Sequence, residues 1–475
     1  MTRLQEIVWV DEALEQSTAL PTAKQHSFPA RIDLYRIPWI RSVLNSRWVQ
    51  LALRTVTLLG FIFTLVTAIS GTLVGSHNFA IIVVWIAWWT ALKLVFIPLG
   101  GRTWCSICPI PLAGDWIQRG GIWVNGKAKR GINLRWPTTL RGSWLQSVGF
   151  LVIGLFSAVT LTDPRLTGWV LLGLLLLSTG MSLIFEHRAF CSHVCPIGGF
   201  SGMYAKTAPV ELRVVDRVVC IDHGDKSCYR ACPWGIYPLT LKDNASCGLC
   251  LDCLRACPQD NLAVNLRQFG GDLANPPGSI RLDETFLALV MLGSALAFSA
   301  VFIGPWGRLK SAAYAIGSLR WIAFGSAFLG LTAILLPALY MGSIWVGKRM
   351  SKSQKPLKQL AATYTAGLLP LGLLSWIAFT LSFALPKINL VLGVLNDPFG
   401  WGWHVLNLAH ITQTLDVSGF SPYLQVVMLL VGAFWSARVT RKISDQNQSA
   451  IASPHLPLLI FYMAYVGTFL WVLLG

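Results

Sequence analysis

The cysteines are the residues whose types and spacing most clearly predict a chemistry, since seven of the eleven lie between positions 220 and 257. The run from Cys247 to Pro258 reads C-x2-C-x2-C-x3-C-P, the spacing of a bacterial ferredoxin. In such a run three thiolates bind one iron–sulfur cluster, and the cysteine before proline reaches a second cluster. The run therefore predicts two clusters and a partner run elsewhere in the chain.

The partner run lies upstream, where Cys228 and Cys232 are separated by three residues and Pro233 follows. Cross-ligation between the two runs predicts one complete group of four thiolates. We call this group the first set: Cys232, Cys247, Cys250 and Cys253. The cysteines left over form the second set: Cys220, Cys228 and Cys257.

The second set lacks a fourth thiol. Counting back from Cys228 with ferredoxin spacing, Asp225 stands where a thiolate is expected. Because a carboxylate is a harder ligand than a thiolate, the sequence is consistent with an Asp225-ligated cluster and with a labile or three-iron cluster. Asp222, His223 and water are further candidates for the fourth position. Alternatively, Asp225 is a turn residue beside Gly224 and binds nothing.

Disulfides and zinc are the alternative uses of these cysteines. Eleven is an odd number, and closely spaced cysteines are poorly placed to pair with one another. A zinc ribbon uses two separated C-x2-C pairs, whereas three cysteines at this spacing surround one small object. The sequence therefore favours two [4Fe-4S] clusters, the second of them [3Fe-4S] or Asp225-ligated in the alternative forms.

The rest of the chain is far more apolar than a soluble protein, with 54% hydrophobic and 12% charged residues among 475. Several stretches approach or exceed the ~20 residues that cross a bilayer. The fold class predicted is a polytopic α-helical membrane protein of nine spans with an inserted two-cluster ferredoxin domain of α+β type. The expected spans are 51–72, 79–99, 145–162, 167–185, 285–304, 321–345, 361–385, 422–438 and 455–474.

Lysine and arginine are concentrated before the first span, after the second and after the sixth. Basic residues mark the cytoplasmic side of a membrane, although the loop 305–320 has the opposite bias. We therefore expect a bacterial inner-membrane protein whose ferredoxin domain is cytoplasmic, where thiols stay reduced. The expected domains are a cytoplasmic N-terminal segment, a four-helix membrane core, the ferredoxin domain with its linker, and a five-helix membrane domain: 1–47, 48–206, 207–282 and 283–475.

The remaining four cysteines form two pairs, each closed by proline. One pair follows the second span and the other follows the fourth, which indicates an internal repeat of two helices plus a motif. We call these residues the membrane-face set: Cys105, Cys108, Cys191 and Cys195. They are candidates for a third cluster or a metal site, for a redox-active dithiol, or for structural thiols that pack the ferredoxin domain against the membrane.

These motifs together resemble the membrane polyferredoxin family. That family includes the ferredoxin-type membrane subunit of periplasmic nitrate reductase systems, the membrane part of the nitrous oxide reductase regulator and a methylamine-utilisation ferredoxin. The resemblance covers residues 50–270 and implies cluster-binding roles for all eleven cysteines. It also implies electron transfer between the quinone pool, or a cytoplasmic donor, and a redox partner. The sequence departs from the family where Cys105 and Cys108 are spaced C-x2-C instead of C-x3-C, and where one ferredoxin thiol is missing.

Ionisable residues near the membrane-face set are candidates for quinone chemistry. Glu186 and His187 come just before Cys191, and a quinone oxidised or reduced beside a cluster needs a proton acceptor or donor. Alternatively, Glu186 forms an ion pair with Arg188. Lys93 lies within the second span, and we expect its side chain to extend to the cytoplasmic surface.

The sequence thus predicts an integral membrane iron–sulfur electron carrier whose partners are membrane lipid, quinone and redox proteins. The alternatives are a quinol-oxidising enzyme subunit and a redox-sensing regulatory or maturation factor. A carrier is favoured over a stand-alone enzyme because the resemblance implies no catalytic turnover of its own. The net charge of +17 is explained by topology and lipid contact, and no nucleic-acid-binding module is visible.

Overall fold

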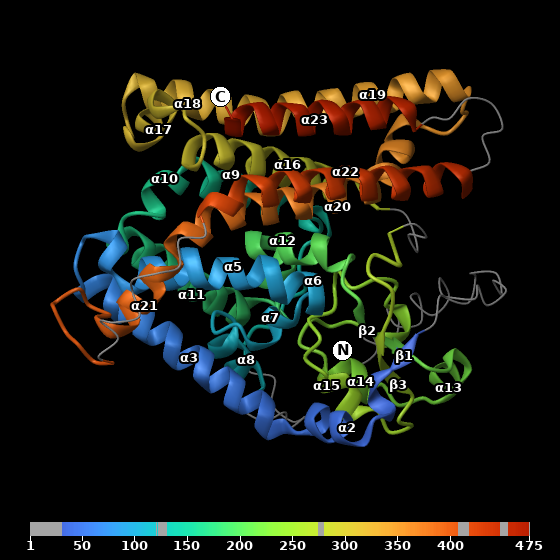
Figure 1. Cartoon of the computed structure of the whole chain (residues 1–475). Helices are drawn as coiled ribbons and strands as arrows, with labels where there is room; N and C mark the ends of the chain where they lie inside the picture. Colours follow the sequence, from blue (N-terminus) through green and yellow to red (C-terminus); the bar gives the residue numbers. More distant parts are fainter. Residues whose placement is uncertain are drawn as a thin grey trace.

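The computed structural model describes residues 31–119, 121, 131–273, 280–406, 418–446 and 455–474. Figure 1 shows three regions: N-terminal helices in blue and green, a small α/β unit at the lower right, and C-terminal helices in yellow to red at the top. Within these described ranges, eight helices are long and apolar enough to cross a membrane. The protein is therefore a mostly helical, multi-pass membrane protein, as the sequence predicts.

Two long N-terminal helices start at polar caps. Helix α3 (Arg47–Ser70) begins after Ser46, whose Oγ accepts a hydrogen bond from the Val49 N–H. Helix α11 (Pro164–Ile184) begins after Asp163, which caps the Leu166 N–H. The second crossing, Phe79–Gly100, alternates between α-helical and π-helical turns: α4 (Phe79–Ile81), η3 (Ile82–Trp88), α5 (Trp89–Ala91), η4 (Leu92–Phe96) and α6 (Ile97–Gly100).

The predicted span 145–162 differs from the expectation. It consists of two short helices, α9 (Trp144–Leu155) and α10 (Ser157–Thr160), which are separated at Phe156. The backbone of Phe156 has φ −98° and ψ 8°, outside the helical region. The segment is therefore not among the eight candidate spans found in the described residues, and the predicted single helix over 145–162 is replaced by two short ones.

The α/β unit contains the ferredoxin run. Strands β2 (Val210–Val214) and β3 (Leu262–Leu266) flank the cysteines and pair antiparallel, with Val210 opposite Leu266. Between them lie the short helices α13 (Arg217–Asp222), α14 (Ser227–Ala231) and α15 (Asp252–Ala256).

A third strand of this sheet comes from the N-terminal segment. Strand β1 (Ile32–Asp33) pairs with β3, which gives the order β1-β3-β2. Helix α2 (Pro38–Asn45) follows it, and Arg41 of this helix forms an ion pair with Asp260 at 2.5 Å. Strand β1 and helix α2 are therefore part of the ferredoxin unit.

The C-terminal helices share one core with the N-terminal ones. Trp376 packs edge-on against Phe200 and Phe298, at ring-centroid distances of 5.4 and 5.5 Å, and its Nε1 donates to the Met291 carbonyl. Trp376 lies in α20 (Leu357–Ala384), Phe200 in α12 (Pro196–Ala205) and Phe298 in α16 (Leu282–Phe302). The core therefore includes helices from both the N-terminal and the C-terminal part of the chain. The helices are α12 (Pro196–Ala205), α16 (Leu282–Phe302), α17 (Gly307–Tyr314), α18 (Leu319–Leu329), α19 (Leu336–Ser351), α20 (Leu357–Ala384), α21 (Ile388–Asn396), α22 (Ser421–Gln446) and α23 (Leu456–Leu474).

Candidate iron–sulfur site

The four thiols of the first set line one small cavity. Its other walls include Trp234, Ile236 and Leu212 from the α/β unit. Among the described residues, no three His, Cys, Asp or Glu side chains converge as they would around a single ion. A cubane instead holds its thiolates apart, at separate iron corners. The donor set and the enclosed apolar surroundings fit a cluster of this kind.

Backbone N–H groups are directed at the sulfur atoms in the same way in two of the three sets. The N–H two residues after the cysteine interacts with its thiol at four positions: Cys108, Cys232, Cys247 and Cys250. At Cys195 the Gly198 N–H, three residues later, donates to the thiol at 3.3 Å. Such hydrogen bonds favour the thiolate and are among the features that set the potential of a protein-bound cluster. Proline after Cys108, Cys195 and Cys232 turns the chain so that these donors point back.

The second set lies beside the first. Asn261 connects two of its thiols, since its backbone N–H donates to Cys257 Sγ at 3.4 Å and its Nδ2 donates to Cys220 Sγ at 3.3 Å. Burial and then the neighbouring thiol of Cys257 raise the pKa of Cys228 to about 12. Three thiols so close together are costly as free thiolates unless a cation compensates them.

Asp225, the predicted fourth ligand, has other partners. Its Oδ1 accepts hydrogen bonds from the Ser227 N–H at 3.0 Å and from Arg230 at 2.8 Å. The side chain is 45% exposed, at the start of α14. In this structure the Asp225 carboxylate is thus bonded to Ser227 and Arg230, and its role at the second set stays a prediction.

The two cysteine pairs of the membrane-face set lie at helical turns that contain different numbers of residues. Cys105 and Cys108 lie on and directly after the α-helical turn α7 (Thr103–Ile107). Cys191 and Cys195 instead span the π-helical turn η6 (Phe190–Val194), which is closed by a hydrogen bond from the Cys195 N–H to the Phe190 carbonyl. The π turn accommodates one more residue, which explains why C-x2-C and C-x3-C motifs can have equivalent roles.

The four membrane-face thiols are close enough to influence one another. Burial and then the Cys105 thiol raise the pKa of Cys108 to about 12. Burial and then the Cys195 thiol raise the pKa of Cys191 well above its usual range, with contributions from Cys108 and Cys105. The structure thus brings together all four residues that the sequence assigned to this set.

A buried ion pair lies between the membrane-face set and the first set. Arg188 Nε donates to Asp115 Oδ1 at 3.1 Å, its Nη1 donates to the Cys105 carbonyl at 2.6 Å, and its guanidinium stacks 4.4 Å from the Trp234 ring. Burial disfavours ionisation of Asp115, but the Arg188 guanidinium outweighs it and holds the pKa of that carboxyl below its usual range. Asp115, and not Glu186, is therefore the partner of Arg188, so the predicted Glu186–Arg188 pair is wrong.

The three sets follow one another in space. Cys105 packs with Trp234 and Cys250 in one buried cluster, which joins the membrane-face set to the first set. Burial, the other thiols of the first set and then Cys228 of the second set raise the pKa of Cys253. In Figure 1, α7 and α8 (Leu112–Arg119) lie between the membrane helices and the α/β unit, as this order requires.

Comparison with known proteins shows which of these motifs carries the similarity. Residues 81–131 and 167–214 match a family described as "4Fe-4S binding domain". Each matched stretch contains one pair of the membrane-face set, so the match falls on the internal repeat and not on the run 220–257.

The curated relatives are ferredoxin-type proteins. The chain is 30% identical over 193 residues to "Ferredoxin-type protein NapH" of Haemophilus influenzae, covering 34% of this chain and 62% of the relative. It is 29% identical over 153 residues to "Methylamine utilization ferredoxin-type protein MauN" of Methylorubrum extorquens, covering 30% and 50%. In these segments the chain is similar to ferredoxin-type membrane proteins, which supports the resemblance to membrane polyferredoxins.

The similarity is partial in extent. The chain spans between half and 62% of the length of these two relatives, and it is 26% identical to "Uncharacterized protein MJ0749" of Methanocaldococcus jannaschii over 82% of that protein. No solved structure matches. The similarity therefore supports iron–sulfur binding in a membrane protein.

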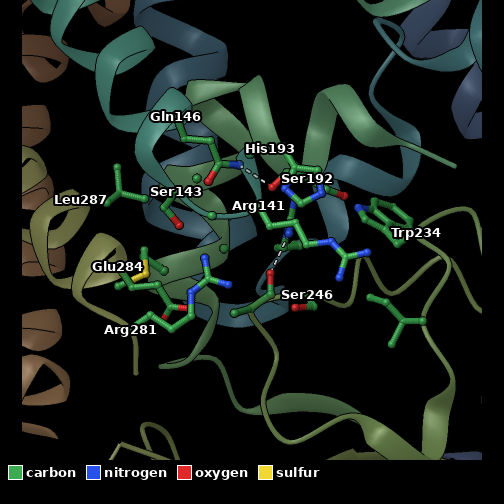
Figure 2. Close-up of a pocket in the computed structure, with 18 residues that line it drawn as sticks. Arg141, Ser143, Gln146, Ser192, His193, Trp234, Ser246, Arg281, Glu284 and Leu287 are labelled. Carbon is green, nitrogen blue, oxygen red and sulfur yellow. Dashed lines mark hydrogen bonds between the residues drawn. The ribbon is translucent and has the colours of Figure 1, made fainter. Parts of the chain in front are cut away.

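A cavity of about 300 Å³ adjoins the membrane-face set (Figure 2). Ser192 and His193, which lie between Cys191 and Cys195, line it together with Trp234, while Arg281 and Glu284 lie on the opposite side. Three arginines line the cavity: Arg102, Arg141 and Arg281. Glu284 is paired with Lys206 at 2.9 Å, so the cavity has a positive character.

Glu186 and His187, the predicted quinone residues, are not among the residues that line this cavity. Glu186 lies 3.9 Å from Arg135 and 4.0 Å from His187. His187 packs against Gly235, where an added Cβ would approach its ring to 2.5 Å. The structure thus places both residues beside the α/β unit, next to the loop that follows Cys232.

Lys93 is a residue whose position the sequence did not predict. Its side chain is fully buried, and its Nζ lies over the rings of Trp89 and Trp376 at 4.7 and 5.0 Å. The expectation that it extends to the cytoplasmic surface is therefore wrong. The signal that could have indicated this is the aromatic neighbourhood of Trp88 and Trp89, one turn before Lys93, since aromatic faces stabilise a buried cation.

Proposed function

We propose that this protein is an integral membrane electron carrier, in which the membrane-face set, the first set and the second set each hold an iron–sulfur cluster. The observation that supports this most directly is the packing of Cys105 against Trp234 and Cys250, because it makes the membrane-face and ferredoxin thiols neighbours. When bound, such clusters accept and release electrons at potentials set by their surroundings. A continuous series of sites supports transfer between the membrane and the outer end of the α/β unit.

The protein's own residues prepare these sites. Backbone N–H groups donate to the sulfur atoms and favour the thiolate form that iron requires. Arg188 acts on thiols of two sets, Cys191 and Cys250, and its charge favours the thiolate form at both sites. The aromatic ring of Trp234 and the surrounding apolar side chains exclude water from the space between them.

The strand order of the α/β unit supports a topology of nine spans. Strand β1 precedes the first span, yet it pairs with β3, which follows α11. Both strands must lie on one side of the membrane, so the number of crossings between them is even. Only three candidate spans lie there, and the interrupted pair α9 and α10 supplies the fourth. Five candidate spans follow, which puts the C-terminus on the opposite side.

The basic segments support a cytoplasmic α/β unit in a bacterial inner membrane. Segments 31–47, 102–141 and 348–358 are rich in lysine and arginine, and with nine spans all three lie on the side of the α/β unit. The loop 305–320 opposes this trend. Reporter fusions test the topology: the N-terminus and residue 280 should report one side, and Gly475 the other. The same side for all three would contradict it.

Quinone is the small-molecule partner that we propose for the membrane end. Glu186 and His187 remain candidates for the proton exchange, but the cavity beside Ser192 and His193 offers a more enclosed space next to the membrane-face set. The α/β unit presents a different surface at the other end, where Val215, Val218 and Ile221 are exposed on and beside α13. We propose that a soluble redox protein docks there, next to Cys220.

Rapid mixing of the anaerobically purified protein with a soluble quinol tests this function. A carrier should show cluster reduction at rates compatible with turnover, followed by electron transfer to an added acceptor. Slow equilibration together with a change in the binding of a partner protein would indicate the redox-sensing alternative. Absence of any quinol-dependent reduction, in protein that contains its clusters, would exclude the quinone as the membrane-end partner.

A further inference from the structure

The second set has three thiols, and the structure shows which residues are free to supply a fourth ligand. Asp225 is bonded to Ser227 and Arg230, and Asp222 is exposed at the end of α13. Neither carboxylate is therefore well placed for ligation. The segment between Cys220 and Cys228 also contains the imidazole of His223, while the hydroxyl of Ser227 is bonded to the Ala256 carbonyl.

His223 differs from both carboxylates in its surroundings. Its Nδ1 atom is buried and has no hydrogen-bond partner among the residues that the structure describes. A buried polar atom without a partner is destabilising, so such an atom calls for an explanation. Coordination to iron would supply the missing partner.

The spacing puts residue 223 about one helical turn after Cys220 of the second set. Residue 223 follows Cys220 by three positions at the end of α13, and its N–H still donates to the Val219 carbonyl. Side chains three residues apart lie on the same side of a helical turn. The segment C-x2-H thus repeats the C-x2-C spacing of the first set, with imidazole in place of the second thiolate.

We propose that His223 is the fourth ligand of the cluster held by Cys220, Cys228 and Cys257. This inference rests on the proposed presence of that cluster. Imidazole is an accepted ligand for iron in iron–sulfur centres. Because imidazole is neutral and thiolate is negative, the cluster would be one charge less negative than an all-cysteine cluster, and its reduction potential would be higher.

Pulsed electron paramagnetic resonance on the reduced full-length protein, prepared with heavy-nitrogen-labelled histidine, tests the ligand. The spectrum should show strong coupling to a histidine nitrogen, and His223→Cys should abolish it while retaining the cluster. Asp225→Cys and His193→Gln serve as matched controls and should leave the coupling unchanged. Coupling that is absent from the native protein, or that persists in His223→Cys, would overturn the proposal.

Iron loss under mild oxidation is a second measurement, and it still tests the proposal if one of the variants folds poorly. A nitrogen ligand exchanges more readily than a thiolate, so mild oxidation should remove one iron from the native second set. His223→Cys should suppress this loss, and Asp225→Cys should not. The opposite result would assign the position to Asp225. Protein that lacks iron and sulfide altogether would instead contradict the proposed function, so the two failures are distinguishable.

Discussion

The first and second sets of the α/β unit come from similar Cys-Pro runs, yet they occupy different environments. The first set is enclosed between the α/β unit and the membrane helices, where Cys250 packs with Cys105 and Trp234. The second set lies at the outer end, beside an α13 whose Val218 is 61% exposed. Under the proposed function, this difference predicts a division of roles: the enclosed first set would relay electrons, and the second set at the edge would exchange them with a partner.

Removing a thiol from the first set should have the largest effect. Cys250→Ser should lose the first cluster, about four iron atoms, and should stop electron transfer from the membrane-face set to the second set. Cys228→Ser should remove only the second cluster and leave quinol-dependent reduction of the other two intact. Iron analysis and quinol-driven spectra of both variants measure this. Equal losses in the two variants would show that the sets are not separate relays.

Breaking the ion pair at the membrane end should have the next largest effect. Arg188→Met leaves the buried Asp115 without its hydrogen-bonded guanidinium, and the loss of one partner costs about 3–5 kcal/mol in comparable buried pairs. The variant should lose thermal stability, and Arg188→Met combined with Asp115→Leu should recover much of it. Loss of the positive charge should also lower the potentials of the membrane-face and first clusters more than that of the second. A uniform shift of all three potentials would contradict the order of the sites.

The sequence predicted the chemistry better than the surroundings that tune it. Cysteine spacing alone grouped the four thiols that line the first cavity, because ligand spacing is local and set by the cluster. Arg188–Asp115 could not be predicted, since the two residues are 73 positions apart and meet only through tertiary packing. The third strand was missed for the same reason: β1 is two residues long and has no pattern of its own.

The interrupted span shows a second limit. Residues 145–162 are apolar enough to predict one helix, but hydropathy does not report the backbone break at Phe156. Lys93 shows a third limit, because a single lysine in an apolar stretch predicts a side chain that extends to the aqueous surface. Only the fold reveals that Trp376, far away in the sequence, provides an aromatic face for it.

The hydrogen bond to Cys220 should give the smallest effect and should be confined to the second set. Asn261→Leu removes the donor to Cys220 Sγ, and one such bond is worth about 1 kcal/mol, or about 40 mV for a one-electron couple. The potential of the second cluster should fall by about this amount, because a donor to sulfur stabilises the reduced state. Tyr237→Phe is the matched control, since Tyr237 donates to the Cys220 carbonyl and not to sulfur. A change in the reduction potential of the first cluster, and not of the second, would contradict the assignment of Cys220 to the second set.

Iron and sulfide analysis combined with low-temperature electron paramagnetic resonance tests the central claim most directly. Three sets of ligands predict about 12 iron atoms and a similar amount of sulfide per chain in anaerobically purified protein. The reduced spectrum should show magnetic interaction between neighbouring clusters, since Cys105 and Cys250 belong to one packed group. Zinc at one or two equivalents without inorganic sulfide, or clusters that do not interact, would contradict the account.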